Sequence, residues 1–170
     1  MIELDQKTVM KGLLHANYQN VPFQFPEGHL FAPMIMGAAL DRVVMEGVKM
    51  PSADLRFCSM TDARLVQVEL SAARAQEIGL SRSRLEEVSL DRGFFSRAVI
   101  RDTQFIRCSL NRTFLDKVEG RSSRWVDCAG ERAVFVAGES ADLSHLSSPL
   151  LYQVATIAAL MAIGEHRATG

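Results

Sequence analysis

The chain has 170 residues, of which 19 are Lys or Arg and 20 are Asp or Glu, so its formal charge is −1. This balance excludes a polycation that binds nucleic acid through bulk charge, and the 48% hydrophobic content excludes a disordered chain. The N-terminus carries Glu3 and Asp5 where a secretory signal would carry bases, and no apolar run reaches the roughly 18 residues of a membrane span. We therefore expect a soluble, cytoplasmic protein of one domain, without a membrane partner.

The first 35 residues are predicted to form an N-terminal cap and an irregular first coil. Asp5 can accept hydrogen bonds from the free N–H groups at the start of a helix that continues to about Asn17. Three apolar residues are predicted on the buried side of this helix: Val9, Leu13 and Leu14. The stretch 18–33 contains three of the five prolines and is predicted to be an irregular lead-in.

From residue 36 to residue 135 the chain repeats with a period of five. Stepping by five from Leu40 to Phe135 meets a large apolar residue everywhere except at Ala75, Gly120 and Gly130. The residue two places before each of these positions is small or aliphatic, or else Ser or Thr. No charged residue of this stretch occupies either position. Both positions are therefore predicted to point into the core.

A period of five fits neither a helix, which needs apolar spacings of three and four, nor a strand, which needs alternation. Each five-residue unit is instead predicted to form one side of a coil, so that about twenty residues complete a coil and coils stack about 4.8 Å apart. The phase continues backward through Ile35, Leu30 and Phe25. Because Gly120 and Gly130 leave the axis underfilled, the last coil is predicted to be irregular.

Three five-residue units carry a family resemblance. Ala53–Phe57, Ala63–Gln67 and Ala141–His145 resemble the A-(D/N)-L-x-x unit of pentapeptide-repeat proteins. The resemblance covers roughly residues 36–135 and implies an all-β solenoid, a right-handed quadrilateral β-helix of about five coils. We assign residues 36–146 to this β-helix.

Residues 147–170 are predicted to form a C-terminal helix. Ser148 followed by Pro149 is a helix start signal, and the chain is almost wholly apolar from Leu150 to Ile163 before Gly164 ends it. A helix that is apolar all round must be covered all round, so we expect it to cap the coils or to pair two copies of the chain as a homodimer. The predicted dimer contacts are Leu150, Leu151, Val154, Ile157, Leu160 and Met161.

No catalytic, cofactor-binding or metal-binding residue is predicted. The four His lie outside the repeats, and none has metal-ligand spacing with a Cys or a carboxylate. Cys58, Cys108 and Cys128 occupy the small inward position, where a free Cys acts as a compact hydrophobe. The adjacent pair Glu86 and Glu87 is interpreted as a solvated corner. An enzyme is therefore not expected.

Function is then expected on the outer surface, where residues twenty apart form columns. Four columns are candidate protein-binding sites, and we name each by its first member. The Arg92 column is Arg92, Arg112 and Arg132, and the Arg64 column is Arg64, Arg84 and Arg124, with Gln104 between. The Phe94 column is Phe94, Phe114 and Val134, and the Val66 column is Val66, Ile106 and Val126, interrupted by Glu86.

Each column has a structural and a functional interpretation. The arginines can be solvated faces neutralised by neighbours such as Asp91 and Glu131. Stacked apolar side chains usually mark a contact with a partner, and the competing interpretation of the Phe94 column is that the terminal segments cover it.

The preferred function is a non-catalytic scaffold or adaptor that presents flat faces to a protein partner of unknown identity. The resemblance implies one concrete version, because members of the family occur with secretion-system adaptors. It also implies an alternative, a regulator of a type II topoisomerase such as gyrase that imitates DNA. The repeats hold 16 Lys or Arg against 14 Asp or Glu, and this near-neutral surface opposes mimicry of DNA. Direct binding of nucleic acid by the Arg columns is a third interpretation.

Overall fold

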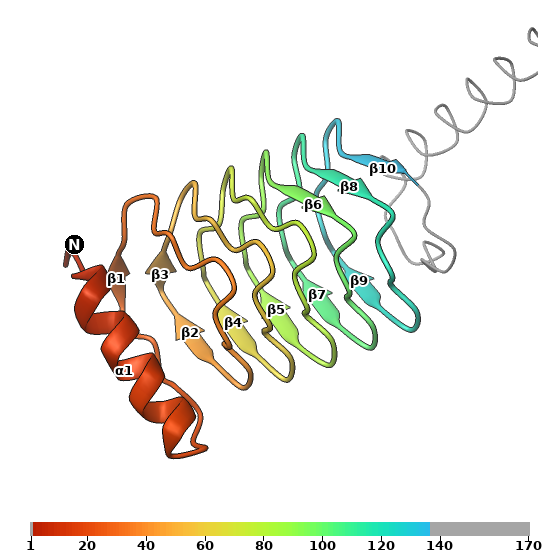
Figure 1. Cartoon of the computed structure of the whole chain (residues 1–170). Coiled ribbons are helices and arrows are strands. Elements are labelled where there is room, and N and C mark those ends of the chain that lie inside the picture. Colours follow the sequence, from red (N-terminus) through yellow and green to blue (C-terminus); the bar gives the residue numbers. More distant parts are fainter. Residues whose placement is uncertain (1, 137–170) are drawn as a thin grey trace, which may run out of the picture.

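A computed structural model describes residues 2–136 as one helix followed by a solenoid of short strands (Figure 1). The helix α1 spans Gln6–Tyr18. The strands are β1 (Gly28–His29), β2 (Val44–Glu46), β3 (Val48–Lys49), β4 (Arg64–Val66), β5 (Arg84–Glu86), β6 (Phe94–Ser96), β7 (Gln104–Ile106), β8 (Phe114–Asp116), β9 (Arg124–Val126) and β10 (Val134–Val136). All of the strands pair in parallel.

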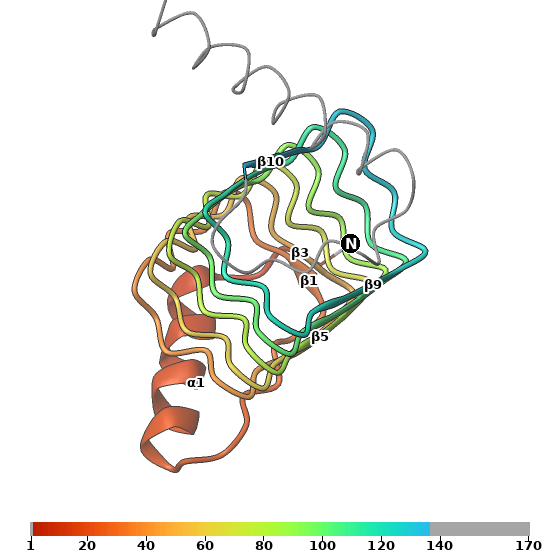
Figure 2. The same cartoon turned by 90° about the vertical axis from the view of Figure 1, so that its right-hand side faces the viewer.

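The register between neighbouring coils is twenty residues. Leu65 of β4 pairs with Leu85 of β5, and Leu85 pairs with Phe105 of β7. Figure 2 looks along the rod and shows the coils superimposed as a four-sided ring, with β9 and β10 on opposite sides. Four five-residue units per coil confirm the predicted four-sided solenoid of the pentapeptide-repeat type.

We number the four faces in the order in which the chain passes them. The first face is the five-stranded sheet β2-β4-β5-β7-β9, and the third face carries the sheet β6-β8-β10. On the third face, the same ladder continues toward the N-terminus through bridges that join Met34, Asp54, Arg74 and Phe94. The second face carries β1 and β3, and the fourth face is a ladder of isolated bridges.

A residue in the left-handed region occupies each corner between faces. Ala72 is an example, with φ 57°, and the turn is closed by a hydrogen bond of 3.1 Å from the Ala73 N–H to the Leu70 carbonyl. Left-handed backbone costs a non-glycine residue roughly 1–2 kcal/mol. The N–H of Ala72 offsets part of this cost by donating to the Asp91 carbonyl of the next coil at 2.7 Å. The side chains at these corners project outward, and arginine is common among them.

The axis is filled by the two inward positions of each unit, as the period predicts. Phe105 and Trp125 stack there with ring centroids 3.9 Å apart and planes 4° from parallel. Polar residues at the small position are satisfied by the backbone: the hydroxyl of Ser83 donates to the Met60 carbonyl at 2.7 Å, and that of Thr113 donates to the Leu90 carbonyl at 2.8 Å. The hydroxyl groups of Ser83 and Thr113 are therefore hydrogen-bonded within the core without a charged partner.

The prediction of an irregular last coil is wrong for the described residues. β9 pairs with β7 and β10 with β8 at the same twenty-residue register as the earlier coils. The space beside Gly120 is occupied by the side chain of Ile100, whose Cδ1 would lie 3.4 Å from a Cβ at that glycine. The neighbouring coil therefore fills the gap, and the ladder continues.

The helix α1 covers the N-terminal end of the rod (Figure 1). Asp5 caps it as predicted, because its carboxylate accepts a hydrogen bond of 2.9 Å from the Thr8 N–H. The buried side consists of Val9, Leu13 and Ala16. The prediction for Leu14 is wrong, since this side chain is 65% exposed: it lies about 100° around the helix from Leu13, outside the stripe that meets the coils.

The predicted C-terminal helix and its dimer contacts, Leu150 to Met161, lie outside the described residues, as does the unit Ala141–His145. Within residues 2–136, no helix has the length and apolar character that a membrane crossing requires.

Candidate interaction surface

A hollow of about 430 Å³ lies at the N-terminal end of the rod and is lined by Ile2, Glu27, Gly28, Gly47 and Lys49. This lining has no Ser, Cys or His that could act as a nucleophile or as its base. In residues 2–136, no group of His, Cys, Asp and Glu has the arrangement of a metal site.

The three cysteines lie in the core, as their position in the repeat predicts. Cys58, Cys108 and Cys128 are buried free thiols. Burial raises the pKa of the Cys58 thiol, and a hydrogen bond with Cys128 together with burial raises the pKa of Cys108. Raised pKa values keep Cys58 and Cys108 as thiols, whereas the hydrogen bond with Cys108 lowers the pKa of Cys128, and all three side chains are buried.

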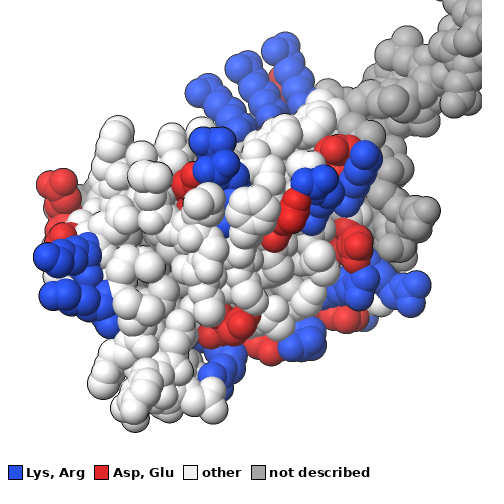
Figure 3. All heavy atoms as spheres, viewed as in Figure 1, with Lys and Arg blue, Asp and Glu red and all other residues white. Residues whose placement is uncertain are grey.

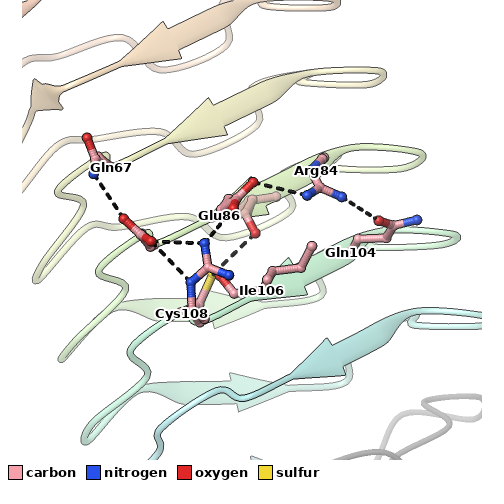
Figure 4. A network of polar contacts seen from close by, with 9 residues as sticks. Gln67, Arg84, Glu86, Gln104, Ile106 and Cys108 are labelled. Carbon is pink, nitrogen blue, oxygen red and sulfur yellow. Dashed lines mark hydrogen bonds and ion pairs between the residues drawn. The ribbon is translucent and has the colours of Figure 1, made fainter.

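The first face carries an ion-pair network that spans three coils (Figure 4). Arg107 donates to Glu86 Oε1 at 2.6 Å and to Glu87 Oε1 at 2.9 Å. Gln67 donates to Glu87 Oε2 at 3.0 Å. Arg84 extends the network from the other side, because it donates to Glu86 Oε2 at 3.0 Å and to Gln104 Oε1 at 3.1 Å.

These contacts lower the pKa of both carboxyls. Hydrogen bonds from Arg84 and Arg107 hold the pKa of Glu86 below its ordinary value, and those from Gln67 and Arg107 do the same for Glu87. The two acids are therefore joined to the neighbouring coils, which corrects the interpretation of Glu86 and Glu87 as a merely solvated corner.

The network includes one member of the Arg64 column, Arg84, and the residue that interrupts the Val66 column, Glu86. In the Arg64 column, Arg84 is paired, whereas Arg64 and Arg124 are exposed and form no ion pair with the described residues. In the Val66 column, Val66 and Ile106 are half-buried and separated by the charged Glu86, and only Val126 is largely exposed. The first face therefore lacks a continuous apolar strip.

The third face has such a strip in the Phe94 column. The rings of Phe94 and Phe114 stack with centroids 5.0 Å apart and planes 5° from parallel. Phe94 is 39% exposed, and Phe114 and Val134 are partly buried. The bridge to Phe94 and the pairing with Phe114 place Arg74 and Val134 on the two outer sides of the stack.

Three further apolar residues of the third face were not predicted from the sequence as surface candidates. Met34, Met36 and Phe57 are exposed, with Met34 at 71%. Met34 belongs to the same ladder as Phe94, since it bridges Asp54, which in turn bridges Arg74. Extending the twenty-residue columns backward into the proline-containing segment would have found it. Phe57 lies at the edge of this face, at a corner with φ 61°.

The Arg92 column forms the edge between the second and third faces. Arg92, Arg112 and Arg132 occupy left-handed corners with φ 58° each, two residues before the first residues of β6, β8 and β10. Arg132 has a weak ion pair with Glu131 at 3.8 Å, while Arg92 and Arg112 form none with the described residues. Figure 3 shows a row of basic side chains that projects from the upper edge of the rod.

Three solved structures are similar to this chain at low sequence identity. QnrB1, a plasmid-mediated fluoroquinolone resistance protein, is 16% identical over 56% of this chain and 48% of its own, with a TM-score of 0.42. HetL is a pentapeptide repeat protein involved in heterocyst differentiation regulation in the cyanobacterium Nostoc sp. strain PCC 7120; it is 16% identical over 70% of this chain and 65% of its own, with a TM-score of 0.31. Rfr23, a pentapeptide repeat protein from the cyanobacterium Cyanothece 51142, is 10% identical over 74% of this chain and 98% of its own, with a TM-score of 0.28.

The chain thus spans about half the length of QnrB1. No protein-family model matches the sequence, and no curated protein matches it either. The similarity concerns the fold alone, and the twenty-residue register establishes that fold independently.

Proposed function

We propose that this chain, whose fold is that of the pentapeptide-repeat proteins, is a non-catalytic scaffold that binds a protein partner through its third face. The observation that supports this proposal is the stack of the exposed Phe94 and the partly buried Phe114 on a rigid ladder. Aromatic side chains are among the residues that contribute most to the free energy of protein binding. A filled solenoid has flat faces rather than clefts, and flat faces suit a macromolecule better than a small molecule.

The rigidity of the ladder favours binding. Phe94 is fixed by hydrogen bonds of its coil to both neighbours, for example from its N–H to the Ala73 carbonyl at 2.9 Å. A surface that is already ordered loses little conformational entropy when a partner binds. The third face therefore offers a preorganised apolar strip, with Met34 and Met36 adding exposed apolar area on the same face toward the N-terminus.

The alternative function, imitation of DNA toward a type II topoisomerase, requires a long negative surface. The third face instead has Arg92 and Arg112 along its edge without acidic partners among the described residues. The charge of this surface therefore opposes mimicry, and we do not propose it.

Affinity purification of the tagged chain from its native host tests the proposal. The test compares the parent with a Phe94→Ser/Phe114→Ser variant and with a control, Val66→Ser/Val126→Ser, on the opposite face. Serine already occupies equivalent outward positions in this chain, at Ser89 and Ser96, so both variants are expected to fold. A specific partner that is lost with the first variant and retained with the second supports the proposal. A partner that both variants retain would refute the third face as the binding surface.

We also propose, from the sequence, that the apolar segment Leu150–Met161 pairs two copies of the scaffold in the cytoplasm. Light scattering of the full chain is expected to report a dimer, and Ile157→Glu a folded monomer. A monomeric parent would contradict this part of the proposal.

A further inference from the structure

The charges of the solenoid are shared unevenly among its faces. The third face with its two edges carries seven basic residues, Arg56, Arg74, Arg92, Arg97, Arg112, Lys117 and Arg132, and only three acidic ones, Asp54, Glu77 and Asp116. The rest of residues 36–135 carries nine basic and eleven acidic residues. The excess of positive charge therefore lies on the face that holds the Phe94 column and on its corners, although Asp91 and Glu131 adjoin the corner that carries Arg92 and Arg132.

Ion pairs within the third face involve two of its acidic residues but none of the arginines closest to the aromatic stack. Asp54 is held by Arg56, with an Nη2 to Oδ2 distance of 2.6 Å, and Glu77 is held by Arg97. These pairs neutralise acids that could otherwise screen the face. Three arginines that surround the stack form no ion pair with any described residue: Arg74, Arg92 and Arg112. They are thus available to an acidic group from outside.

The geometry of the stack argues against nucleic acid as the occupant. Single-stranded nucleic acids bind to aromatic side chains by stacking bases on exposed ring faces. Phe94 and Phe114 turn one face of each ring toward the other, and Arg74 and Val134 lie on the outer sides. Ring edges are then what the surface presents, and an aromatic edge carries partial positive charge that attracts carboxylates.

We infer that the third face binds an acidic peptide segment of a partner protein, with apolar side chains against the Phe94–Phe114 stack and carboxylates at Arg74, Arg92 and Arg112. This inference rests on the proposed function and adds the charge of the partner. Arginine binds a carboxylate through paired N–H donors, and complementary charge raises the rate of association and excludes partners of the wrong sign.

Selection from a random library of short peptides displayed on phage, against the immobilised full-length chain, tests the inference. The selected peptides are expected to be acidic and to contain aromatic or aliphatic residues. Each is then measured as a synthetic peptide against Arg92→Glu/Arg112→Glu and against a matched control, Arg64→Glu/Arg124→Glu, on the opposite face. Glutamate is compatible with both backbones, because Glu77 and Glu87 occupy left-handed corners and Glu69 and Glu119 occupy the position of Arg64 in other units.

The Arg92→Glu/Arg112→Glu variant is expected to bind the acidic peptides at least about tenfold more weakly, and the control within about twofold of the parent. Three results would overturn the inference. The selected peptides could be neutral or basic, both variants could lose the same affinity for the peptides, or a single-stranded oligonucleotide could bind more tightly than any peptide. A library without any enriched peptide would overturn it as well. The proposed scaffold function would survive these results if the affinity purification still yields a partner that depends on Phe94 and Phe114.

Discussion

Phe94 and Phe114 lie one coil apart with their ring centroids 5.0 Å from each other and their planes 5° from parallel. This spacing follows the stacking of the coils, since residues paired across a parallel ladder lie about 4.8 Å apart. The same relationship occurs inside the rod between Phe105 and Trp125, at 3.9 Å. One aromatic stack therefore stabilises the core and the other faces solvent, where packing of the solenoid alone does not require it.

The register predicts opposite outcomes for the same substitution at adjacent residues. Leu65 is fully buried and Arg64 is exposed. Leu65→Asp is expected to lower the free energy of unfolding by more than about 4 kcal/mol, because it buries an unpaired charge, whereas Arg64→Asp should change it by about 0.5 kcal/mol or less. Urea denaturation followed by circular dichroism measures both, and similar losses would contradict the assignment of inward positions.

The stack of Phe105 on Trp125 is expected to stabilise the C-terminal coils. Trp125 is 5% exposed, so Trp125→Ala should lower the free energy of unfolding by about 3–5 kcal/mol through lost packing and the cavity left behind. The exposed neighbour Arg124 provides the control, since Arg124→Ala should have little effect. Because Trp125 is the only tryptophan, its emission in the parent also reports on this site, and a spectrum typical of a solvated indole would argue against the stack.

The network on the first face predicts a pH-dependent effect of Arg107→Ala. The pKa values of Glu86 and Glu87 are lowered in the folded chain, so their pairing with Arg107 stabilises the fold above the ordinary carboxyl pKa and is lost as the pH falls through the lowered values. Arg107→Ala should therefore be less stable than the parent at neutral pH and equal to it in strong acid. The control Arg92→Ala, which removes an arginine without an ion pair among the described residues, should show no such difference, and thermal unfolding at several pH values measures it.

The cysteines are expected to be unreactive in the folded chain. All three are buried, and the pKa values of Cys58 and Cys108 are raised. The pKa of Cys128 is lowered by its hydrogen bond with Cys108, so this thiol is protected by its burial alone. Ellman's reagent should therefore modify them slowly in buffer and completely in denaturant. Rapid modification of any thiol in buffer would contradict its place in the core.

The coils could be predicted from the sequence because the period of five repeats one physical requirement, an apolar axis, at every unit. The surface was harder to predict, because outward positions have no such requirement. Glu86 and Glu87 looked like a solvated pair until the coils brought Arg107 beside them. Leu14 shows the same limit, since its apolar side chain does not reveal which side of α1 meets the coils.

Photo-crosslinking in the native host tests the central claim, that the third face binds a protein, most directly. A benzoylphenylalanine is placed at Arg74, beside the Phe94–Phe114 stack, or at Arg64 on the opposite face; both positions are exposed. Binding through the third face predicts a discrete crosslinked species from position 74 and none from position 64. The same species from both positions, or a species from position 64 alone, would contradict the claim.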